Sequence, residues 1–168
     1  PPLARRVAII SSASGAALQD FLSILKRRGW NGSVFLFNSP VQGKDAPAGL
    51  SEALSRAVSF SGIDLVVLAR GGGSIEDLWA FNDENLVRQV ASCPIPTISA
   101  VGHQTDFVLT DFGADFRAET PSAAAEWISS EHVRLLKKLE QLGSRLRDIP
   151  EDFLSRSHDR VQLNEVRL

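Results

Sequence analysis

Residues 64–74 read DLVVLARGGGS, an apolar run that leads directly into an arginine and three glycines. The apolar side chains occupy successive positions and do not alternate with polar ones, which is typical of a strand covered on both faces of its sheet. Sheets of this kind are parallel and carry helices on either side. The stretch therefore predicts a parallel strand that ends in a glycine-rich loop.

Three further runs have the same character. They are residues 7–11 (VAIIS), 33–37 (SVFLF) and 97–101 (TISAV), and with residues 64–68 they make four expected strands. Apolar residues with helical spacing lie between them, at residues 18–25, 50–58 and 86–91. Strands that alternate with helices predict parallel pairing with right-handed crossovers. We predict an α/β fold over residues 1–120, an open, mostly parallel, doubly wound sheet with flanking helices.

Residues 121–168 read as a long C-terminal helix with a different period. With His132 filling one gap, apolar residues recur there at heptad a/d spacing: Ile128, Leu135, Leu139, Leu142, Leu146, Ile149 and Phe153. The narrow seam and its flanking charges favour the start of a coiled coil over a helix that packs only on its own domain. Pro150 lies within the seam and is expected to kink or interrupt the helix.

The composition excludes several classes of protein. Hydrophobic residues make up 43% and charged residues 23%, which is ordinary for a globular domain and unlike a disordered or collagen-like chain. No apolar run approaches the roughly 20 residues of a membrane-spanning helix, and no signal peptide is recognisable. The single cysteine, Cys93, fits a reducing compartment, so the expected location is cytoplasmic.

Two further features bear on what part of a protein this is. The sequence contains no methionine and begins Pro1-Pro2, so we expect a fragment or processed piece of a longer protein. Its net charge of −2 gives no electrostatic sign of a nucleic-acid binder, but that charge describes one part only.

Small, polar or glycine-rich segments follow three of the expected strands. Residues 11–16 (SSASGA) follow the first strand and lead into a helix with Asp20, residues 69–74 (ARGGGS) follow the third, and residues 102–106 (GHQTD) follow the fourth. Ligands of open α/β sheets bind at the carboxyl ends of the strands. We therefore expect all three segments to open onto one crevice.

The triple-glycine loop suits a phosphate group. Glycines let backbone N–H groups approach an anion, and the N-terminus of a following helix adds donors and partial positive charge. Arg70 can bind two phosphate oxygens at once. The loop matches neither the dinucleotide pattern nor the nucleoside triphosphate pattern. A plain glycine turn beside a solvated arginine is the alternative, and spacing alone does not choose between the two.

His103 and Asp106 are three residues apart, one turn of a helix, and so could share a face. A histidine can move a proton in either direction near neutral pH, and a nearby carboxylate can orient its ring. A structural capping pair is the alternative. Asp20 lies opposite the apolar face of its helix, and spacing alone makes it a surface carboxylate.

Two aromatic residues follow the glycine loop. Trp79 and Phe81 could stack on bases, but Trp79, next to Leu78, is expected in the core. The nucleophile pattern GxSxG is absent, so we set a serine hydrolase aside.

Five segments, in order, resemble the large subunit of bacterial exodeoxyribonuclease VII. They are residues 14–20 (SGAALQD), 41–47 (VQGKDAP), 69–82 (ARGGGSIEDLWAFN), 99–106 (SAVGHQTD) and 120–126 (TPSAAAE). In that family an OB-fold domain precedes this region, and a long coiled coil that binds several small subunits follows it. The resemblance implies that residues 1–120 form the catalytic domain and residues 121–168 begin the coiled coil.

The resemblance also implies an activity, the hydrolysis of single-stranded DNA from both the 5′ and the 3′ end to oligonucleotides with 5′-phosphates. The family's catalytic residues fall on Asp20, Arg70, His103 and Asp106. The phosphate-binding residues that we expect are Arg70, Gly71, Gly72, Gly73, Ser74 and Thr105. Gln104 and Glu119 depart from the residues common in the family, but neither is one of the four.

The expected mechanism is attack of water on phosphorus in line with a departing 3′-oxygen, with no cofactor required. Arg70 and the loop amides would meet the developing charge, and His103 would transfer a proton while Asp106 or Asp20 orients the ring or the water. The competing hypothesis is that Asp20, His103 and Asp106 hold Mg²⁺ or Mn²⁺.

The expected partners are single-stranded DNA, the small subunits and a second copy through the C-terminal helix, and no membrane. The alternative from another class of protein is a non-catalytic phosphate- or nucleotide-binding α/β module with a coiled-coil oligomerisation helix.

Overall fold

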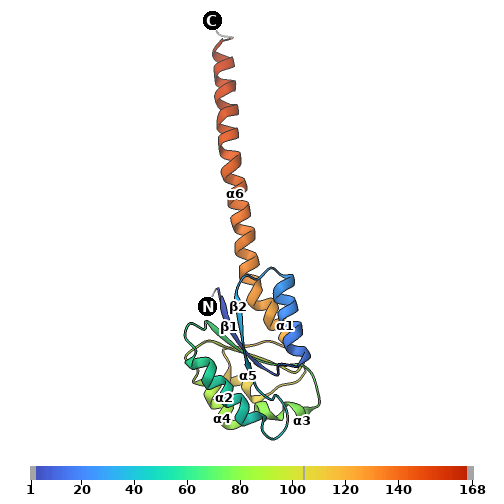
Figure 1. The fold of residues 1–168 in the computed structure, drawn as a ribbon. Coiled ribbons are helices and arrows are strands. Elements are labelled where there is room, and N and C mark those ends of the chain that lie inside the picture. The colour runs from blue at the N-terminus through green and yellow to red at the C-terminus, as the bar shows by residue number, and fades with distance from the viewer. Residues whose placement is uncertain (1–2, 104, 166–168) are drawn as a thin grey trace. The chain divides into compact units, whose positions relative to one another are not determined.

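The computed structural model describes residues 3–103 and 105–165, with side chains described as far as Leu146. The chain divides into two compact units, Pro1–Glu131 and His132–Leu168. Its elements, labelled in Figure 1, follow one another in this order: β1 (Arg6–Ser11), α1 (Ala16–Arg27), β2 (Ser33–Asn38), α2 (Ala46–Ser59), β3 (Leu65–Arg70), α3 (Ile75–Leu78), the 3₁₀-helix η1 (Trp79–Asn82), α4 (Glu84–Ala91), β4 (Thr97–Val101), α5 (Leu109–Gly113), β5 (Phe116–Arg117) and α6 (Pro121–Glu165).

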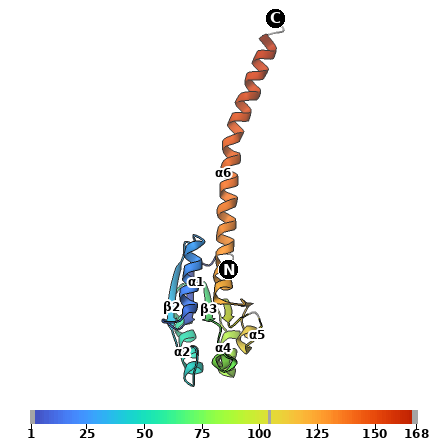
Figure 2. The ribbon, with the colours of Figure 1, turned by 90° about the vertical axis from the view of Figure 1, so that its right-hand side faces the viewer.

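Five parallel strands form one open sheet in the order β2-β1-β3-β4-β5. The central strand β3 pairs with β1 on one side and with β4 on the other, so that Val67 lies between Ile9 and Ile98. Helices cover both faces of the sheet (Figures 1 and 2). The predicted doubly wound parallel sheet with flanking helices is confirmed, and so is the long C-terminal helix.

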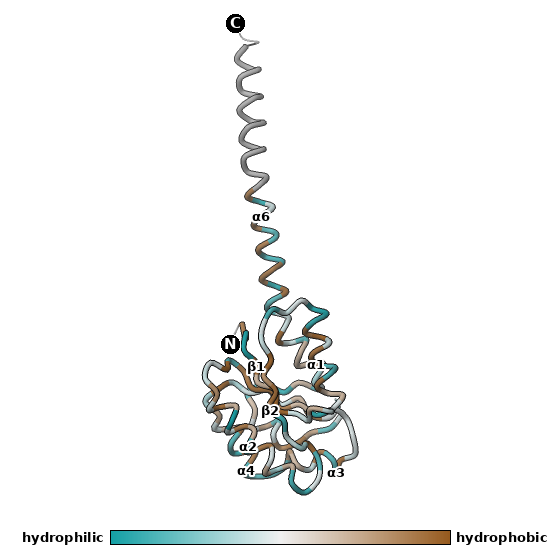
Figure 3. Tube along the Cα trace, in the orientation of Figure 1, coloured by the Kyte–Doolittle hydropathy of each residue, from teal (hydrophilic) through white to brown (hydrophobic). Residues whose placement is uncertain are grey.

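Alternate residues of β3 point to opposite faces and build two separate cores. Leu65, Val67 and Ala69 belong to the core that contains α1 and the first turns of α6. Val66 and Leu68 belong to the core that contains α2 and α4. All five side chains are buried, and Figure 3 shows hydrophobic residues concentrated along the strands. Burial on both faces is the physical reason for the unbroken apolar runs in the sequence.

β3 starts one residue later and ends two residues later than the sequence predicts. Asp64, the residue before β3, accepts hydrogen bonds with its carboxylate from the N–H groups of Arg5 and Arg6, both at 2.9 Å. β3 ends later because Arg70 still pairs with Val101 of β4. The backbone of Arg70 is therefore held in the sheet and is not part of the loop.

The sequence patterns did not predict four short elements, α3, η1, α5 and β5. The longest of them has five residues, too few to show a helical or strand period. Their positions nevertheless matter, since they flank the carboxyl edge of β3 and β4.

α6 begins at Pro121, the residue at which the helical segment was predicted to start. Ala124, Ala125 and Ile128 in its first turns are buried in the core that contains α1. α6 continues through Pro150 as one helix, so an interruption at that residue is wrong. A proline removes only one backbone hydrogen bond from a helix, and the bonds on either side of it can maintain a long helix.

The predicted apolar seam continues along α6. Leu139, Leu142 and Leu146 of this seam are exposed. The side chains of Ile149 and Phe153 lie outside the described residues. Within the described part of the chain, no helix combines the length and the apolar character needed to cross a membrane.

Candidate active site

The carboxyl ends of β1, β3 and β4 bring the three predicted segments to one edge of the sheet. The N–H of Gly102 donates a hydrogen bond of 3.1 Å to the carbonyl of Arg70, which fastens the loop after β4 to the end of β3. A Cβ built on Gly71 would lie 3.8 Å from the Cβ of Ala17, so the first turn of α1 adjoins the glycine loop. The expected convergence of the segments is thus observed.

Arg70 is buried, and the surrounding polar groups hold its guanidinium in place. Nη1 donates to the Gly71 carbonyl at 2.8 Å, and Nη2 donates to Gln42 Oε1 at 2.9 Å. Nη2 also lies 3.2 Å from Asp77 Oδ2, in an ion pair with only 7% of the arginine side chain exposed. Arg70 is therefore not the solvated arginine of the alternative interpretation. The structure places a fixed positive charge under the loop.

The glycine loop lies directly against the His103 ring. A Cβ on Gly72 would overlap the imidazole, so only glycine allows this approach. Gly72 and Gly73 are exposed, and no hydrogen bond to the described residues occupies their backbone N–H groups. These N–H groups are available to an anion beside the imidazole.

Ser74 has a local structural role. Its hydroxyl accepts a hydrogen bond from Asp77 N–H at 3.4 Å, and its own N–H donates to Asp77 Oδ2 at 3.3 Å. This capping box lies at the N-terminus of α3, a helix of only four residues. The expected contribution of a helix N-terminus is therefore not supported, because so short a helix aligns few peptide dipoles and Glu76 and Asp77 lie in its first turn.

His103 and Asp106 lie in a turn, so the helical spacing used to pair them was wrong. Asp106 N–H donates to the His103 carbonyl at 3.0 Å, and His103 N–H donates to Asp106 Oδ2 at 3.2 Å. The turn begins at Gly102, whose positive φ of 80° favours glycine. It still brings His103 Nδ1 within 3.6 Å of Asp106 Oδ2. Thr105 is exposed in the same turn and donates to Asp106 Oδ1 at 3.4 Å.

Arg117 of β5 supports this turn from behind. Its Nη2 donates to the carbonyls of Asp106 at 3.0 Å and His103 at 3.5 Å. Its Nε donates at 3.1 Å to Oδ2 of Asp111, a buried carboxylate that also accepts hydrogen bonds from the Ser99 hydroxyl and from Val108 N–H. A chain of polar contacts thus connects β4 and β5 to the backbone that carries His103.

Comparison with known proteins identifies the protein family of this chain. The family model described as "Exonuclease VII, large subunit" matches residues 1–168. The chain belongs to the exonuclease VII large subunit family. It is 51% identical over 147 residues to the exodeoxyribonuclease 7 large subunit of Alcanivorax borkumensis. These residues make up 88% of this chain and 33% of that protein.

Two other exonuclease VII large subunits show the same relationship. The Erwinia tasmaniensis protein is 45% identical over 93% of this chain and 34% of its own length. The Sodalis glossinidius protein is 44% identical over all of this chain and 37% of its own length. The chain thus spans about a third of the length of these curated relatives.

The structure brings together three of the four catalytic positions implied by the exonuclease VII resemblance. Arg70, His103 and Asp106 lie together around the glycine loop. Asp20 is exposed on α1, and among the described residues no hydrogen bond or ion pair joins it to the other three. Gln104, one of the two departures from the family pattern, lies outside the described residues.

The metal-binding hypothesis needs Asp20, His103 and Asp106 to converge. Among the described residues, no three His, Cys, Asp or Glu side chains are grouped closely enough to hold a metal ion. The set therefore does not fit a three-ligand metal site in this conformation, and we derive no step through a metal.

Sequence reasoning missed several residues of this edge. Gln42 and Asp77 contact Arg70, and Arg117, paired with Asp111, supports the turn that carries His103. Gln42 and Arg117 lie far in sequence from the residues that they contact. Asp77 and Asp111 lie in helices too short to predict. Only Asp77 had a local signal, the Ser-x-x-Asp spacing of a capping box. The prediction that Trp79 lies in the core is wrong. Trp79 is 66% exposed, while Phe81 is fully buried, because the change from α3 to the tighter η1 turns Leu78 and Phe81 inward.

Proposed function

We propose that this chain is the catalytic part of an exonuclease that hydrolyses single-stranded DNA from both ends to oligonucleotides with 5′-phosphates. The observation that carries the proposal is the surface formed by the Gly72 and Gly73 N–H groups, with the Arg70 guanidinium below it and the His103 imidazole against it. It combines donors for a phosphate with a group that transfers protons, which phosphate binding alone does not require.

The chemistry follows from the charges that the reaction creates. Water attacks phosphorus, the 3′-oxygen leaves, and negative charge grows on the non-bridging oxygens. Donors fixed in advance stabilise that charge without reorganising, and the N–H groups of Gly72 and Gly73 would serve as these donors. His103 protonates the leaving oxygen or accepts the proton of the water, and Asp106, 3.6 Å from Nδ1, orients the ring.

Several expectations about the whole protein accompany this proposal. The small subunits would bind along the coiled coil begun by α6, where Leu139, Leu142 and Leu146 are exposed. A second copy of the chain could instead pair with α6 through the same leucines. We expect the assembly in the cytoplasm, where the single thiol of Cys93 would stay reduced.

The direct test uses a full-length large subunit that contains this chain, assembled with its small subunit. Single-stranded DNA labelled at the 5′ end or at the 3′ end is incubated with the complex. We expect both labels to appear in short oligonucleotides, and the internal product ends to carry 5′-phosphates. Binding without cleavage would instead identify the non-catalytic phosphate-binding module.

Metal dependence is tested with the same complex. We expect the cleavage rate to be unchanged by EDTA, with Arg70 and the loop amides meeting the charge. A rate that falls in EDTA and returns with Mg²⁺ or Mn²⁺ would contradict this and favour the metal-binding hypothesis for Asp20, His103 and Asp106.

Replacing Gly72 with alanine tests the contact between the loop and the imidazole. The new Cβ would displace the His103 ring, and a catalytic group misplaced by about 1 Å costs about 10²-fold in rate. Cleavage kinetics of Gly72→Ala and Gly71→Ala provide the comparison, because a Cβ at Gly71 meets only Ala17 at 3.8 Å. Equal losses in the two variants would refute a specific contact with His103.

Arg117 is a positioning residue for the turn that carries His103. Arg117→Gln removes the donors that hold the carbonyls of His103 and Asp106, so we expect kcat to fall roughly 10-fold or more while KM changes little. Arg117→Lys retains a cation beside Asp111 and should restore part of the rate. Loss of thermal stability with unchanged kcat would assign Arg117 a structural role only.

A further inference from the structure

One exposed aromatic residue lies beside the candidate active site without a role in the chemistry above. Trp79 is 66% exposed, whereas its neighbours Leu78, Ala80 and Phe81 are all buried. It lines a hollow of about 380 Å³, which we name the Trp79 hollow, formed by Gly43, Lys44, Pro47, Glu76, Trp79 and Ala80. A volume of this order is at the lower end of the range of small-ligand pockets.

Both walls of the Trp79 hollow are attached to Arg70. The wall with Gly43 and Lys44 directly follows Gln42, which accepts a hydrogen bond from Arg70 Nη2 at 2.9 Å. The wall with Glu76 and Trp79 contains Asp77 between them, which pairs with the same Nη2 at 3.2 Å. A group in this hollow would therefore lie next to the elements that fix the positive charge under the glycine loop.

The charges of the Trp79 hollow suit a flat ring better than a second phosphate. Lys44 contributes one positive charge and Glu76 one negative charge, so the hollow has no net attraction for an anion. Hydrogen bonds from its own backbone N–H and from the Ser74 hydroxyl lower the pKa of Glu76, which keeps its carboxylate ionised at neutral pH. The remaining surface is apolar, from Trp79, Pro47 and Ala80.

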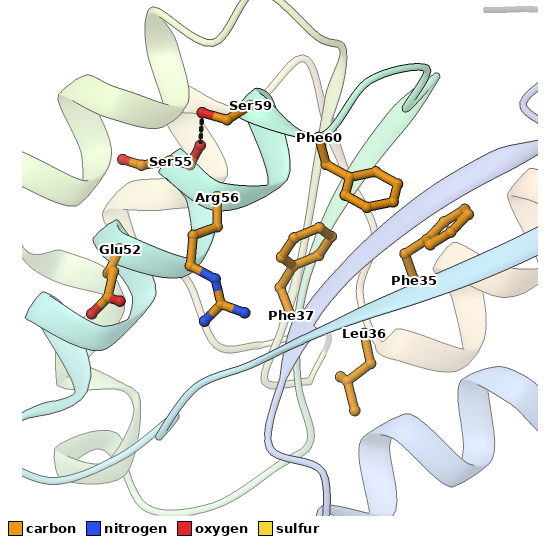
Figure 4. Close-up of a pocket in the computed structure, with 8 residues that line it drawn as sticks. All are labelled: Phe35, Leu36, Phe37, Glu52, Ser55, Arg56, Ser59 and Phe60. Atoms are coloured by element: carbon orange, nitrogen blue, oxygen red, sulfur yellow. Dashed lines mark hydrogen bonds between the residues drawn. The ribbon is translucent and has the colours of Figure 1, made fainter.

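A larger hollow, about 610 Å³, runs along β2 and α2 and also contains aromatic rings (Figure 4). Its rings already contact one another, with Phe60 5.1 Å from Phe35 and 6.1 Å from Phe37 between centroids. The guanidinium of Arg56 lies over Phe37 at 5.9 Å. Among the described residues, none that lines this hollow forms a hydrogen bond or an ion pair with Arg70, so the hollow offers neither a free aromatic face nor a connection to the active site.

We propose that the Trp79 hollow is a base-stacking subsite that holds one nucleotide of the single-stranded DNA beside the phosphate being cut, an inference that rests on the proposed function. The indole face stacks on the base, and the backbone of that nucleotide leads to the glycine loop. Stacking accepts every base, because each has a flat π face. The subsite would thus bind single strands, whose bases are unpaired, without selecting a sequence.

The test combines changes in the protein and in the substrate, again with the full-length large subunit and its small subunit. Trp79→Ala is expected to lower kcat/KM on a normal oligonucleotide by about 5- to 100-fold, the range found when an aromatic platform is removed. Trp79→Phe should retain most of the rate. The control is Ile75→Ala, since Ile75 is 70% exposed on the adjacent α3 but does not line the hollow.

An oligonucleotide with consecutive abasic sites then identifies the occupant. If a base stacks on Trp79, the wild-type complex cuts the abasic strand more slowly, and Trp79→Ala adds little further loss. An equal effect of Trp79→Ala on normal and abasic strands would overturn the subsite and indicate that a protein segment covers Trp79. A Trp79→Ala complex that cuts normal DNA at the wild-type rate would overturn it as well. Absence of cleavage by the wild-type complex would instead refute the proposed function.

Discussion

Replacement of His103 with alanine is expected to slow the cleavage of single-stranded DNA by about 10²–10⁴-fold, the usual cost of losing a general acid or base. The imidazole is the proton-carrying group beside the Gly72 and Gly73 N–H groups, and it is 64% exposed. Because the side chain is not part of either core, the variant should fold normally. Single-turnover kinetics measure the cleavage rate, and circular dichroism measures whether the variant is folded.

The control for this variant is His132→Ala, which removes a histidine from α6 and leaves the carboxyl edge intact. We expect its cleavage rate to equal that of the wild type. A folded His103→Ala complex with near-normal turnover would remove His103 from the mechanism, whatever the behaviour of the control.

The second large effect is expected at Arg70. Arg70→Ala removes the guanidinium that lies under the loop, and we expect a loss of the size seen when one oxyanion-stabilising group is removed, about 10²–10³-fold in kcat. It also leaves Asp77 and Gln42 without their shared partner, so the thermal unfolding midpoint should fall. Arg70→Lys keeps the charge, but an ammonium cannot reproduce the planar fork that bridges Gly71, Gln42 and Asp77.

Asp77→Asn separates the two consequences of losing Arg70. It breaks the ion pair while leaving the guanidinium in the protein, so it should lower stability with a smaller loss of rate. Arg56→Ala, at the hollow along β2, is the control for removing an arginine elsewhere, with cleavage unchanged (Figure 4). Equal rates for Arg70→Ala and the wild type, in a folded complex, would exclude a role for Arg70 in charge stabilisation.

The sequence was sufficient for most of the sheet because β1, β3 and β4 are buried on both faces, whereas the edge strand β2 is only partly buried. β3 shows this most clearly, since Val66 and Val67 lie in different cores and both must be apolar. β5 could not be found in this way. It has two residues, Phe116 and Arg117, which are only half-buried, so the strand leaves no apolar run.

The site was predictable only in part, for a related physical reason. The carboxyl ends of parallel strands meet at one edge by geometry, so the convergence of Arg70 with His103 followed from topology. The contacts that hold these residues come from separate segments, such as Gln42 on Arg70 and Arg117 behind His103. Such pairings depend on the final fold, and no spacing within either segment reports them.

The most direct test of catalysis at this edge of the sheet is to map where the DNA strand lies. A full-length His103→Ala complex, which we expect to bind DNA and to cut it slowly, is photo-crosslinked to single-stranded DNA containing 5-iodouracil, and the modified peptides are identified by mass spectrometry. We expect crosslinked peptides from residues 69–82 and 102–107, where Trp79 and Phe107 are exposed. Crosslinks confined to other parts of the protein would contradict cleavage at this site.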